Sequence, residues 1–493
     1  MRKIVLISLS TFALGAAAMA SADQLTRTKG QDTYKMLELF GDVLVKVKSQ
    51  YVVPVDDKKL IQAAIDGMLT SLDPHSNYLD PSSFGDMREE TRGQYGGLGL
   101  EVTSEEGAVK VISPMDGTPA ARAGVMAGDF ITSIDGNSII GMNLTDAVKQ
   151  MRGAVGTSIT LTIVRERKPP FTVKLVREII DVKTVHSRPI GDVGYLRVSG
   201  FDQRTGEETT AALKDLKSKI PHMKGLVLDL RNNPGGLVDS SVEVASDLLD
   251  GGEIVSQRGR DPKDIERYNA RPNGDMIRGV PIVVLINNGT ASAAEIVSGA
   301  LKDRQRATII GLTSFGKGSV QTVIPLRNGA DGAVKLTTAR YYTPSGQSIQ
   351  KTGIIPDMQV ARSKAEAEAV SDTAQQYSEA SFKNALDSQE VKVRSAPDEI
   401  EIPADKAEEK EIKDKDGKPK PRPLRSAFTL TDEDVAADFQ LQRALDVLRF
   451  GGVKQAKLQK PAKVFTQPKS AFAKTEAPAT PATPPAKDAP SKP

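Results

Sequence analysis

Apolar runs alternate with amphipathic patterns through the middle of the chain. One run covers residues 225–231 and ends in Asn232-Asn233-Pro234-Gly235-Gly236, and a second, β-branched run covers residues 282–286 and ends in Asn287-Asn288-Gly289. Both have the composition of buried strands closed by strong turn formers. Further strands are predicted at 194–198, 307–311 and 333–340, with helices at 205–220 and from Ser292 onward. Strands that alternate with helices predict an α/β core over residues 178–360.

The stretches before this core follow other patterns. Residues 34–91 are predicted to be helical, with one helix starting near Tyr34 and another over residues 57–72. Residues 92–177 combine glycine-rich turns with short alternating strands, which include Ile159-Thr160-Leu161-Thr162-Ile163. This change of pattern predicts a small, separate domain over residues 92–177.

The chain after the core is predicted to be a helical extension, residues 361–450, that contains a charged linker. Residues 363–387 would form one or two exposed helices, and residues 395–423 would form the proline-containing linker. A capped helix would end at Gly451, and its apolar side needs a partner surface on the core, on another subunit or on an adaptor. Residues 451–493, rich in Ala, Pro and Lys, are expected to be a disordered tail.

The first residues, 1–22, have the pattern of a cleavable secretory signal. Arg2 and Lys3 precede an apolar run that reaches Ala18, and small residues follow where cleavage would occur. An uncleaved membrane anchor is the alternative, although the run is shorter than the ~20 residues that span a bilayer. The chain has no cysteine, so disulfides and thiol chemistry are excluded. We therefore expect export to a bacterial periplasm.

Charge and composition narrow the classes of partner. The chain has 66 Lys and Arg against 63 Asp and Glu, a near balance that gives no case for nucleic-acid binding. Aromatic residues make up 4% and Trp is absent, which argues against a base-stacking surface. No cluster of His, Asp and Glu has metal-ligand spacing, so neither a metal nor another cofactor is predicted. The expected partners are proteins.

The strand, turn and helix that follow residue 281 point to a nucleophile. Ser292 stands where the predicted helix begins, at the end of a tight turn that lifts a side chain out of the fold. Amide N–H groups at a helix start are unpaired and favour negative charge. A serine at this place therefore has an oxyanion-binding site beside it.

Lys317 is the candidate base for that serine. The chain has three histidines, none near Ser292 in sequence, although catalytic groups are assembled in space. Lys317 lies between two glycines, which let the backbone approach other groups closely. A lysine acts as a general base when it is neutral, and burial among apolar groups lowers its pKa. Gln321, a little further on, is placed to orient the amine by a hydrogen bond.

These residues resemble the active site of the carboxy-terminal processing peptidases, also called tail-specific proteases. That family's serine lies in a Thr-Ala-Ser-Ala turn, matched by Thr290 to Ala293, and its lysine lies in a Phe-Gly-Lys-Gly turn, matched by Phe315 to Gly318. Gln321 matches the family's glutamine. The resemblance covers residues 34–360 and implies a crotonase-like ββα core, a Ser-Lys dyad and an inserted PDZ domain.

The resemblance also assigns backbone groups to the site. The Asn-Pro-Gly-Gly turn would supply one oxyanion donor, the amide of Gly235 or Gly236, and the amide of Ala293 would supply the other. Residues 92–177 resemble a PDZ domain, whose glycine-rich loop binds a peptide's terminal carboxylate while an edge strand pairs with the peptide. That loop is Gly96-Gly97-Leu98-Gly99 here.

Two charged residues are each left with two interpretations. Arg152 matches a position that couples the PDZ domain to the protease site in this family, and a solvated arginine is the alternative. His75 lies in a Ser-Leu-Asp-Pro-His-Ser motif that the family also carries. We interpret it as a hydrogen-bonded scaffold residue rather than a catalytic one.

Other chemistries fit these residues less well. Ser314-Phe315-Gly316-Lys317 matches the Ser-x-x-Lys motif of penicillin-binding enzymes, but its glycine disfavours the helix that the motif requires. Residues 311–318 nearly match a phosphate-binding loop, but a glycine replaces the hydroxyl that would bind Mg²⁺. A trypsin-like PDZ protease would need a His-Asp-Ser set with its serine in a Gly-Asn-Ser-Gly-type turn, and the sequence has no such turn. A non-catalytic PDZ scaffold or chaperone is the alternative function, and the presence of Ser292, Lys317 and Gln321 disfavours it.

The sequence thus predicts a periplasmic serine endopeptidase that cleaves proteins near their C-termini. Its PDZ domain would capture substrates that have free, apolar C-termini, and neutral Lys317 would activate Ser292. An adaptor protein is a further candidate partner, and the spare terminal helices suggest a homo-oligomer.

Overall fold

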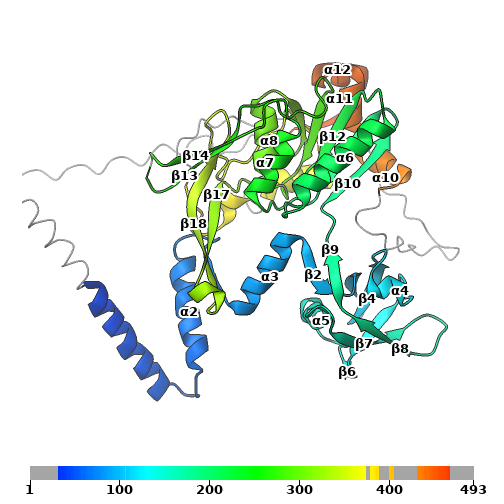
Figure 1. Ribbon diagram of the computed structural model, residues 1–493. Coiled ribbons are helices and arrows are strands. Elements are labelled where there is room, and N and C mark those ends of the chain that lie inside the picture. Colours follow the sequence, from blue (N-terminus) through cyan, green and yellow to red (C-terminus); the bar gives the residue numbers. More distant parts are fainter. Residues whose placement is uncertain are drawn as a thin grey trace, which may run out of the picture. The chain divides into compact units, whose positions relative to one another are not determined.

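The computed structural model of the protein describes residues 32–105, 107–261, 263–373, 378–387, 399–404 and 430–466. The chain forms two compact units, Met1–Thr70 and Ser71–Pro493 (Figure 1). The predicted secretory signal and most of the charged linker lie outside the described residues. Among the described residues, no helix has the length and apolar character needed to cross a membrane.

The described part of the first unit consists of two helices, as the sequence predicts. One spans residues 32–50 and the other, α2, spans Asp57–Thr70. Large apolar side chains of the first helix are exposed, including Tyr34 at 74% and Leu37 at 59%. In α2 only Leu69 is buried.

A six-stranded sheet forms the centre of the second unit, in the order β10-β11-β12-β15-β16-β19 (Figure 1). β10 is antiparallel to β11, and the remaining neighbours are parallel. The strands are β10 (Val185–Ile190), β11 (Val193–Val198), β12 (Gly225–Asp229), β15 (Ile282–Ile286), β16 (Ala307–Gly311) and β19 (Met358–Gln359). Because β12 and β15 are parallel neighbours, the turns that follow them lie at the same edge of the sheet.

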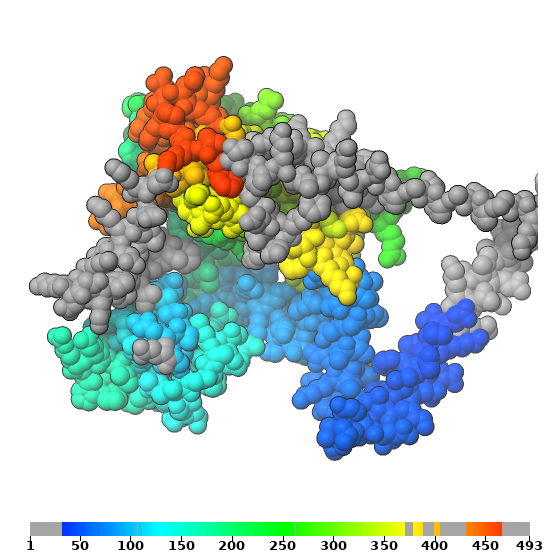
Figure 2. Space-filling view, turned by 180° about the vertical axis from the view of Figure 1, so that it is seen from behind, coloured from blue at the N-terminus to red at the C-terminus, as the bar shows by residue number. Residues whose placement is uncertain are grey.

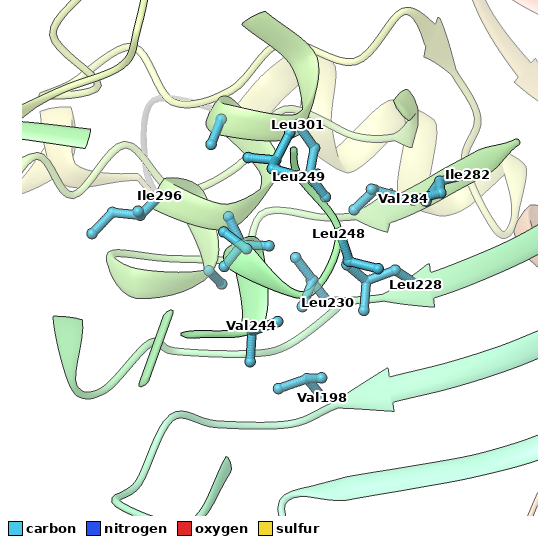
Figure 3. Packing of buried hydrophobic residues seen from close by; sticks show 14 of the residues in the cluster. Val198, Leu228, Leu230, Val244, Leu248, Leu249, Ile282, Val284, Ile296 and Leu301 are labelled. Carbon is cyan, nitrogen blue, oxygen red and sulfur yellow. The ribbon is translucent and has the colours of Figure 1, made fainter. Parts of the chain in front are cut away.

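Helices cover both faces of this sheet. On one face, α6 (Thr205–Lys219), α7 (Val238–Ser246) and α8 (Ala293–Asp303) enclose the main core, in which Leu228, Leu248 and Leu301 are fully or almost fully buried (Figure 3). On the other face lie α10 (Asp432–Ala437), α11 (Phe439–Phe450) and α12 (Val453–Gln459). Figure 2 shows these C-terminal helices, orange to red, on the outside of the unit. The partner surface that the predicted helix needed is therefore the core sheet.

A second, five-stranded sheet includes β17, the strand that directly follows the lysine turn, residues 315–318. Its strand order is β1-β18-β13-β14, with β17 paired to β18. The strands are β1 (Asn77–Leu79), β13 (Glu253–Arg258), β14 (Ile265–Asn269), β17 (Ser319–Pro325) and β18 (Ala333–Tyr342). β1 lies inside the region predicted to be helical, and the reason for the difference is its long-range pairing with the start of β18. α3 (Pro81–Arg92) then completes that region, and η1 (Arg327–Gly329) connects β17 to β18.

Residues 94–181 form the small inserted domain. Its sheet has the order β3-β4-β5-β7-β8, with β6 paired to β5, and a separate pair, β2-β9, joins its two ends. The elements are β2 (Gln94–Gly97), β3 (Leu100–Glu105), β4 (Ala108–Pro114), α4 (Pro119–Arg122), β5 (Phe130–Ile134), β6 (Asn137–Ser138), α5 (Leu144–Met151), β7 (Ser158–Val164), β8 (Phe171–Val176) and β9 (Glu178–Asp181). The domain has a hydrophobic core of its own.

The C-terminal region differs from the prediction in two places. Residues 363–387 contain α9 (Lys364–Thr373) and the short η2 (Glu379–Ser381), but Glu379 is fully buried rather than exposed. The predicted linker and tail each contribute a strand, β20 (Glu399–Ile402) and β21 (Lys463–Thr466), which pair with one another. The expectation of disorder from residue 451 is therefore wrong as far as residue 466, because α12 and β21 pack on the described C-terminal elements.

Candidate active site

Two turns meet at the carboxyl ends of β12 and β15. The amide N–H of Asn232 donates to Oδ1 of Asn287, and the Asn287 side-chain amide donates to Oδ1 of Asn232, both at 2.8 Å. The hydroxyl of Thr290 donates to the carbonyl of Leu230 at 2.8 Å. These bonds fix the Asn-Pro-Gly-Gly turn against the serine turn.

Ser292 lies at the junction of the serine turn and α8. Its backbone has φ 53° and ψ −115°, a conformation that side-chain-bearing residues rarely adopt, and only 9% of the residue is exposed. Such backbone strain costs about 1–3 kcal/mol and persists only where surrounding contacts maintain it. Gly235 is one of these contacts, because a Cβ there would lie 2.8 Å from the Ser292 Cβ.

The backbone donors beside Ser292 are not equivalent. The N–H of Gly235 donates to Oδ1 of Asn233 at 2.9 Å, so it is already engaged. The N–H groups of Gly236 and Ala293 donate to no acceptor among the described residues. Of the two glycines that the sequence left open, Gly236 therefore has the available amide.

Glu295, which the sequence analysis did not select, joins the serine turn to the lysine turn. It lies one turn into α8 and is fully buried. Its Oε2 accepts from the amide N–H groups of Ser292 at 2.8 Å and Lys317 at 2.9 Å. Its Oε1 accepts from the Ser314 hydroxyl at 2.6 Å and the Gly316 N–H at 2.7 Å. One carboxylate thus fixes the backbone of both candidate catalytic residues.

Two opposing effects act on Glu295. Its pKa is raised to about 7, because burial raises it by more than the four donated hydrogen bonds lower it. Because every neighbour donates, the ionised carboxylate is the form that this site accommodates. An acidic residue three positions after a helix cap is a recognised capping pattern, so the sequence did contain a signal for Glu295.

Lys317 lies in the loop between β16 and β17, and its side chain is largely buried. Burial is the main reason that its pKa falls to about 8, and the positive charge of Lys335 lowers it further. The carboxylates of Glu379, Glu295 and Asp73 act in the opposite direction. Nearly half of such lysines would be neutral slightly below pH 8, which suits a general base.

The side chains of the predicted catalytic residues do not bond to each other here. Within the described residues, no hydrogen bond joins Nζ of Lys317 to Oγ of Ser292, and catalytic hydrogen bonds often tighten only with substrate bound. Gln321 lies in β17, where its amide donates to the hydroxyls of Ser319 at 2.9 Å and Thr337 at 3.3 Å. Its predicted bond to the Lys317 amine is likewise not formed.

His75 belongs to a hydrogen-bonded scaffold, in line with our interpretation of it. Its Nε2 bonds to the carboxylate of Glu379 at 2.8 Å. Asp73, in the same motif, accepts from the Thr337 hydroxyl at 3.0 Å and from Ser76 at 2.6 Å, and Thr337 in turn accepts from Gln321. The motif therefore holds Thr337 of β18, the residue to which the Gln321 amide donates.

The predicted carboxylate-binding loop of the inserted domain lies beside a groove. β3 is an edge strand, and the groove between β3 and α5 is lined by Leu98, Leu100, Val102, Val148 and Met151. The N–H groups of Leu98 and Gly99 donate to no acceptor among the described residues. Gly96 must lack a side chain, since a Cβ there would lie 2.2 Å from the carbonyl oxygen of Gly153.

Arg152 lies at the end of α5 and contacts its own domain. Its guanidinium carbon is 4.3 Å from the centre of the Tyr95 ring, a cation–π contact, and both residues line the groove. Coupling of Arg152 to the protease site stays a prediction.

Comparisons with known proteins agree with this architecture. The profile of peptidase family S41 matches residues 192–360, a PDZ domain profile matches 110–165, and the profile of the activating protease CtpB N-terminal domain matches 9–83. A carboxy-terminal-processing protease from Bartonella bacilliformis is 54% identical over 362 residues, which cover 73% of this chain and 82% of that protein. A probable CtpA-like serine protease from Staphylococcus aureus is 37% identical over 347 residues, covering 70% of this chain and 66% of that protein.

Two solved structures are also similar. The photosystem II D1 C-terminal processing protease is 35% identical, with a TM-score of 0.39, and the match covers 64% of this chain and 85% of that chain. The peptide-bound PDZ domain of a carboxy-terminal protease from Vibrio cholerae is 22% identical, with a TM-score of 0.17, and the match covers 18% of this chain and 99% of that chain.

The α/β core and its PDZ domain thus define a serine-type peptidase that processes C-termini. The chain belongs to peptidase family S41, with the carboxy-terminal processing proteases. The predicted family and fold class are confirmed.

Proposed function

We propose that this chain is an exported serine endopeptidase in which Ser292 and Lys317 form the catalytic dyad. The observation that carries the proposal is Glu295, whose single carboxylate oxygen accepts from the amides of both residues. We infer that this shared buried acceptor keeps the two turns in register, which would let the serine and the lysine act on one reaction centre.

The proposed reaction passes through an acyl-enzyme. Neutral Lys317 takes the hydroxyl proton of Ser292, whose oxygen attacks the scissile carbonyl carbon. The oxyanion is held by the amides of Gly236 and Ala293, because the Gly235 amide already donates to Asn233. Lys317 then gives the proton to the leaving amine, which departs with the C-terminal fragment. Water attacks the ester with Lys317 as its base, and this step releases the acid and restores Ser292.

Capture of the substrate is proposed for the PDZ domain. The free edge of β3 accepts an added strand, and the apolar groove beside α5 takes an apolar last residue. The amides of Leu98 and Gly99, which donate to no acceptor in the part of the chain that the structure describes, are suited to bind the terminal carboxylate. The substrates are therefore proteins with free, apolar C-termini.

Cellular context belongs to the same proposal. The basic residues and apolar run of the first 22 residues support export to the periplasm. An adaptor that recruits substrates and a homo-oligomer both remain part of the proposal, and the exposed apolar side chains of residues 32–50 supply a surface for either.

The test uses the chain from Asp23 onward and an unfolded protein with an apolar C-terminus, offered with a free or an amidated carboxyl end. Ser292→Ala and Lys317→Ala should each abolish cleavage. Ser298→Ala, on the same helix, should leave cleavage near the wild-type rate, because the Ser298 hydroxyl donates to the backbone carbonyls of Ala294 and Glu295 within its own helix. The amidated substrate should be cleaved more slowly.

Other outcomes are equally informative. Normal cleavage by Lys317→Ala would rule out the dyad. Binding without cleavage by the wild-type chain would favour the non-catalytic PDZ scaffold.

A further inference from the structure

The lysine turn is fixed from two opposite sides. Glu295 accepts from the amides of Gly316 and Lys317 on the side of α8. On the other side, Oε1 of Gln350 accepts from the Gly318 N–H at 2.8 Å, and the N–H of Lys351 donates to the Gly316 carbonyl at 2.8 Å. The N–H groups of three successive residues in this turn, 316–318, therefore donate to side-chain oxygens.

Glu379 supports this second side. It is fully buried, and its Oε1 accepts from the Gln350 amide at 2.9 Å while its Oε2 bonds to His75 Nε2 at 2.8 Å. Its own N–H donates to the carbonyl of Phe315, the first residue of the lysine turn, at 3.0 Å. Phe382 adds ring contacts to Phe315 and His75, with centroids 5.9 and 6.2 Å apart. The segment after the core, residues 378–387, thus packs directly on the lysine turn.

The negative charge of Glu379 acts on Lys317 and raises the pKa of its amine. Four charged groups from four elements face Lys317: Glu295 of α8, Lys335 of β18, Asp73 before β1, and Glu379 of η2. Among the carboxylates, Glu379 has the largest effect in favour of the charged amine. Removing its charge should therefore make Lys317 neutral at lower pH.

We propose that Glu379 is a positioning residue for Lys317: from outside the core it holds the lysine turn through Gln350 and the Phe315 carbonyl and presents a negative charge to the amine. The proposal rests on Lys317 acting as the base. It makes the segment that follows the core part of the active site.

The test compares Glu379→Gln with wild type in the full chain. As pH increases, wild-type kcat/KM should rise with a midpoint near pH 8, the pKa of Lys317, and this rise is the acid limb of the pH profile. In Glu379→Gln the limb should move to lower pH by on the order of half a unit, because an opposite charge has been removed. The limiting kcat/KM at high pH should fall severalfold, since the amide can no longer accept from both Gln350 and His75.

The matched control is Glu368→Gln, an exposed residue of α9 whose ion pair within the described part of the chain is with Lys364. This substitution should change neither the midpoint of the acid limb nor the limiting kcat/KM at high pH. A purely structural role would lower the rate of Glu379→Gln without moving the limb, and that result would overturn the proposal. If Glu379→Gln fails to fold, Glu379→Asp replaces it: its retracted carboxylate should move the limb in the same direction by less, and an unmoved limb would again overturn the proposal.

A second readout separates this proposal from the dyad itself. In a Ser292→Ala background, Lys317 can be acylated by an amine-reactive reagent at a series of pH values. The pH dependence of the acylation rate gives the pKa of Lys317 without any catalysis. A lower pKa in Glu379→Gln supports the positioning role even if Lys317→Ala proves active. An unchanged pKa contradicts that role even if the dyad holds.

Discussion

At the scale of single residues, burial of the proposed base Lys317 is expected to lower the stability of the folded protein. Its ammonium is buried, so the folded state disfavours the charged form, and its pKa lies near 8 against 10.5 for a free lysine. Below pH 8 the amine is charged in both states and the folded protein is destabilised in full. As pH rises from about 8 to 10.5 the destabilisation is lost.

We therefore expect Lys317→Met to be inactive but more stable at pH 6. The gain in the free energy of unfolding should be about 1–3 kcal/mol, and it should shrink at pH 9.5. Urea unfolding at the two pH values measures it, with the exposed Lys454→Met as control. An equal gain at both pH values would mean that burial of charge is not the cause.

Glu295 gives a second prediction at this scale. In Glu295→Gln the new amide group would face N–H donors, so at least one of the four hydrogen bonds is lost inside the protein. The expected cost is about 2–4 kcal/mol of stability, together with a fall in kcat of at least about 100-fold. Glu207→Gln, an exposed acid in the first turn of α6, should be neutral in both measurements. Full activity of Glu295→Gln would show that the two turns keep their register without it.

Sequence reasoning selected Ser292 and Lys317 because local chemistry marks them: a strand, a tight turn and a helix start for one, flanking glycines for the other. It could have found Glu295, whose spacing from Ser292 is that of a helix cap. It could not have found Glu379, which bonds to His75 across 304 residues of sequence. No local pattern distinguishes that buried carboxylate from the exposed acids around it.

At the scale of elements, the lysine turn depends on close backbone contact. A Cβ on Gly318 would lie 2.4 Å from the backbone nitrogen of Gln350. Gly318→Ala should therefore displace the turn, break the bond from Gly318 to Gln350 and reduce kcat/KM by at least about 100-fold. Gly85→Ala, in open space within α3, should be fully active and up to about 1 kcal/mol more stable. Peptidase assays and thermal unfolding of both variants check this.

α11 is predicted to be as integral to the fold as the sheet that it covers. Leu441 is fully buried against the sheet face that contains Val227 and Leu285. Leu441→Ala should lower the free energy of unfolding by about 2–5 kcal/mol. Leu458→Ala, in α12 and 72% exposed, should change it by less than about 0.5 kcal/mol. Similar values for the two variants would mean that α11 is only loosely attached.

The strands of the core were predictable because each is a short apolar run between turn formers. β1, β20 and β21 were not, since each is only three or four residues long and forms by pairing with a distant segment. The burial of α11 was also open, because an amphipathic pattern shows that a helix needs a partner but not which one.

At the scale of the whole molecule, the PDZ domain is an independent structural part. Its core draws only on residues between Leu98 and Leu175, and β2 pairs with β9 to close its ends. Residues 93–182 alone should therefore unfold cooperatively and bind a peptide with a free apolar C-terminus, but not the amidated peptide. Calorimetric titration of both peptides tests this, and equal binding would contradict carboxylate capture.

The long-range pairing of Arg231 with Asp438 has a consequence for the timing of activity. Arg231 lies two residues before the Asn-Pro-Gly-Gly turn, residues 233–236, and its guanidinium donates to the Asp438 carboxylate at 2.7 and 3.0 Å. Synthesis supplies residue 438 last among the parts of this site, about two hundred residues after the turn itself. A chain that is still being synthesised therefore holds Arg231 without its Asp438 partner, and we expect the turn beside Ser292 to gain this part of its support only after residue 438 has been made.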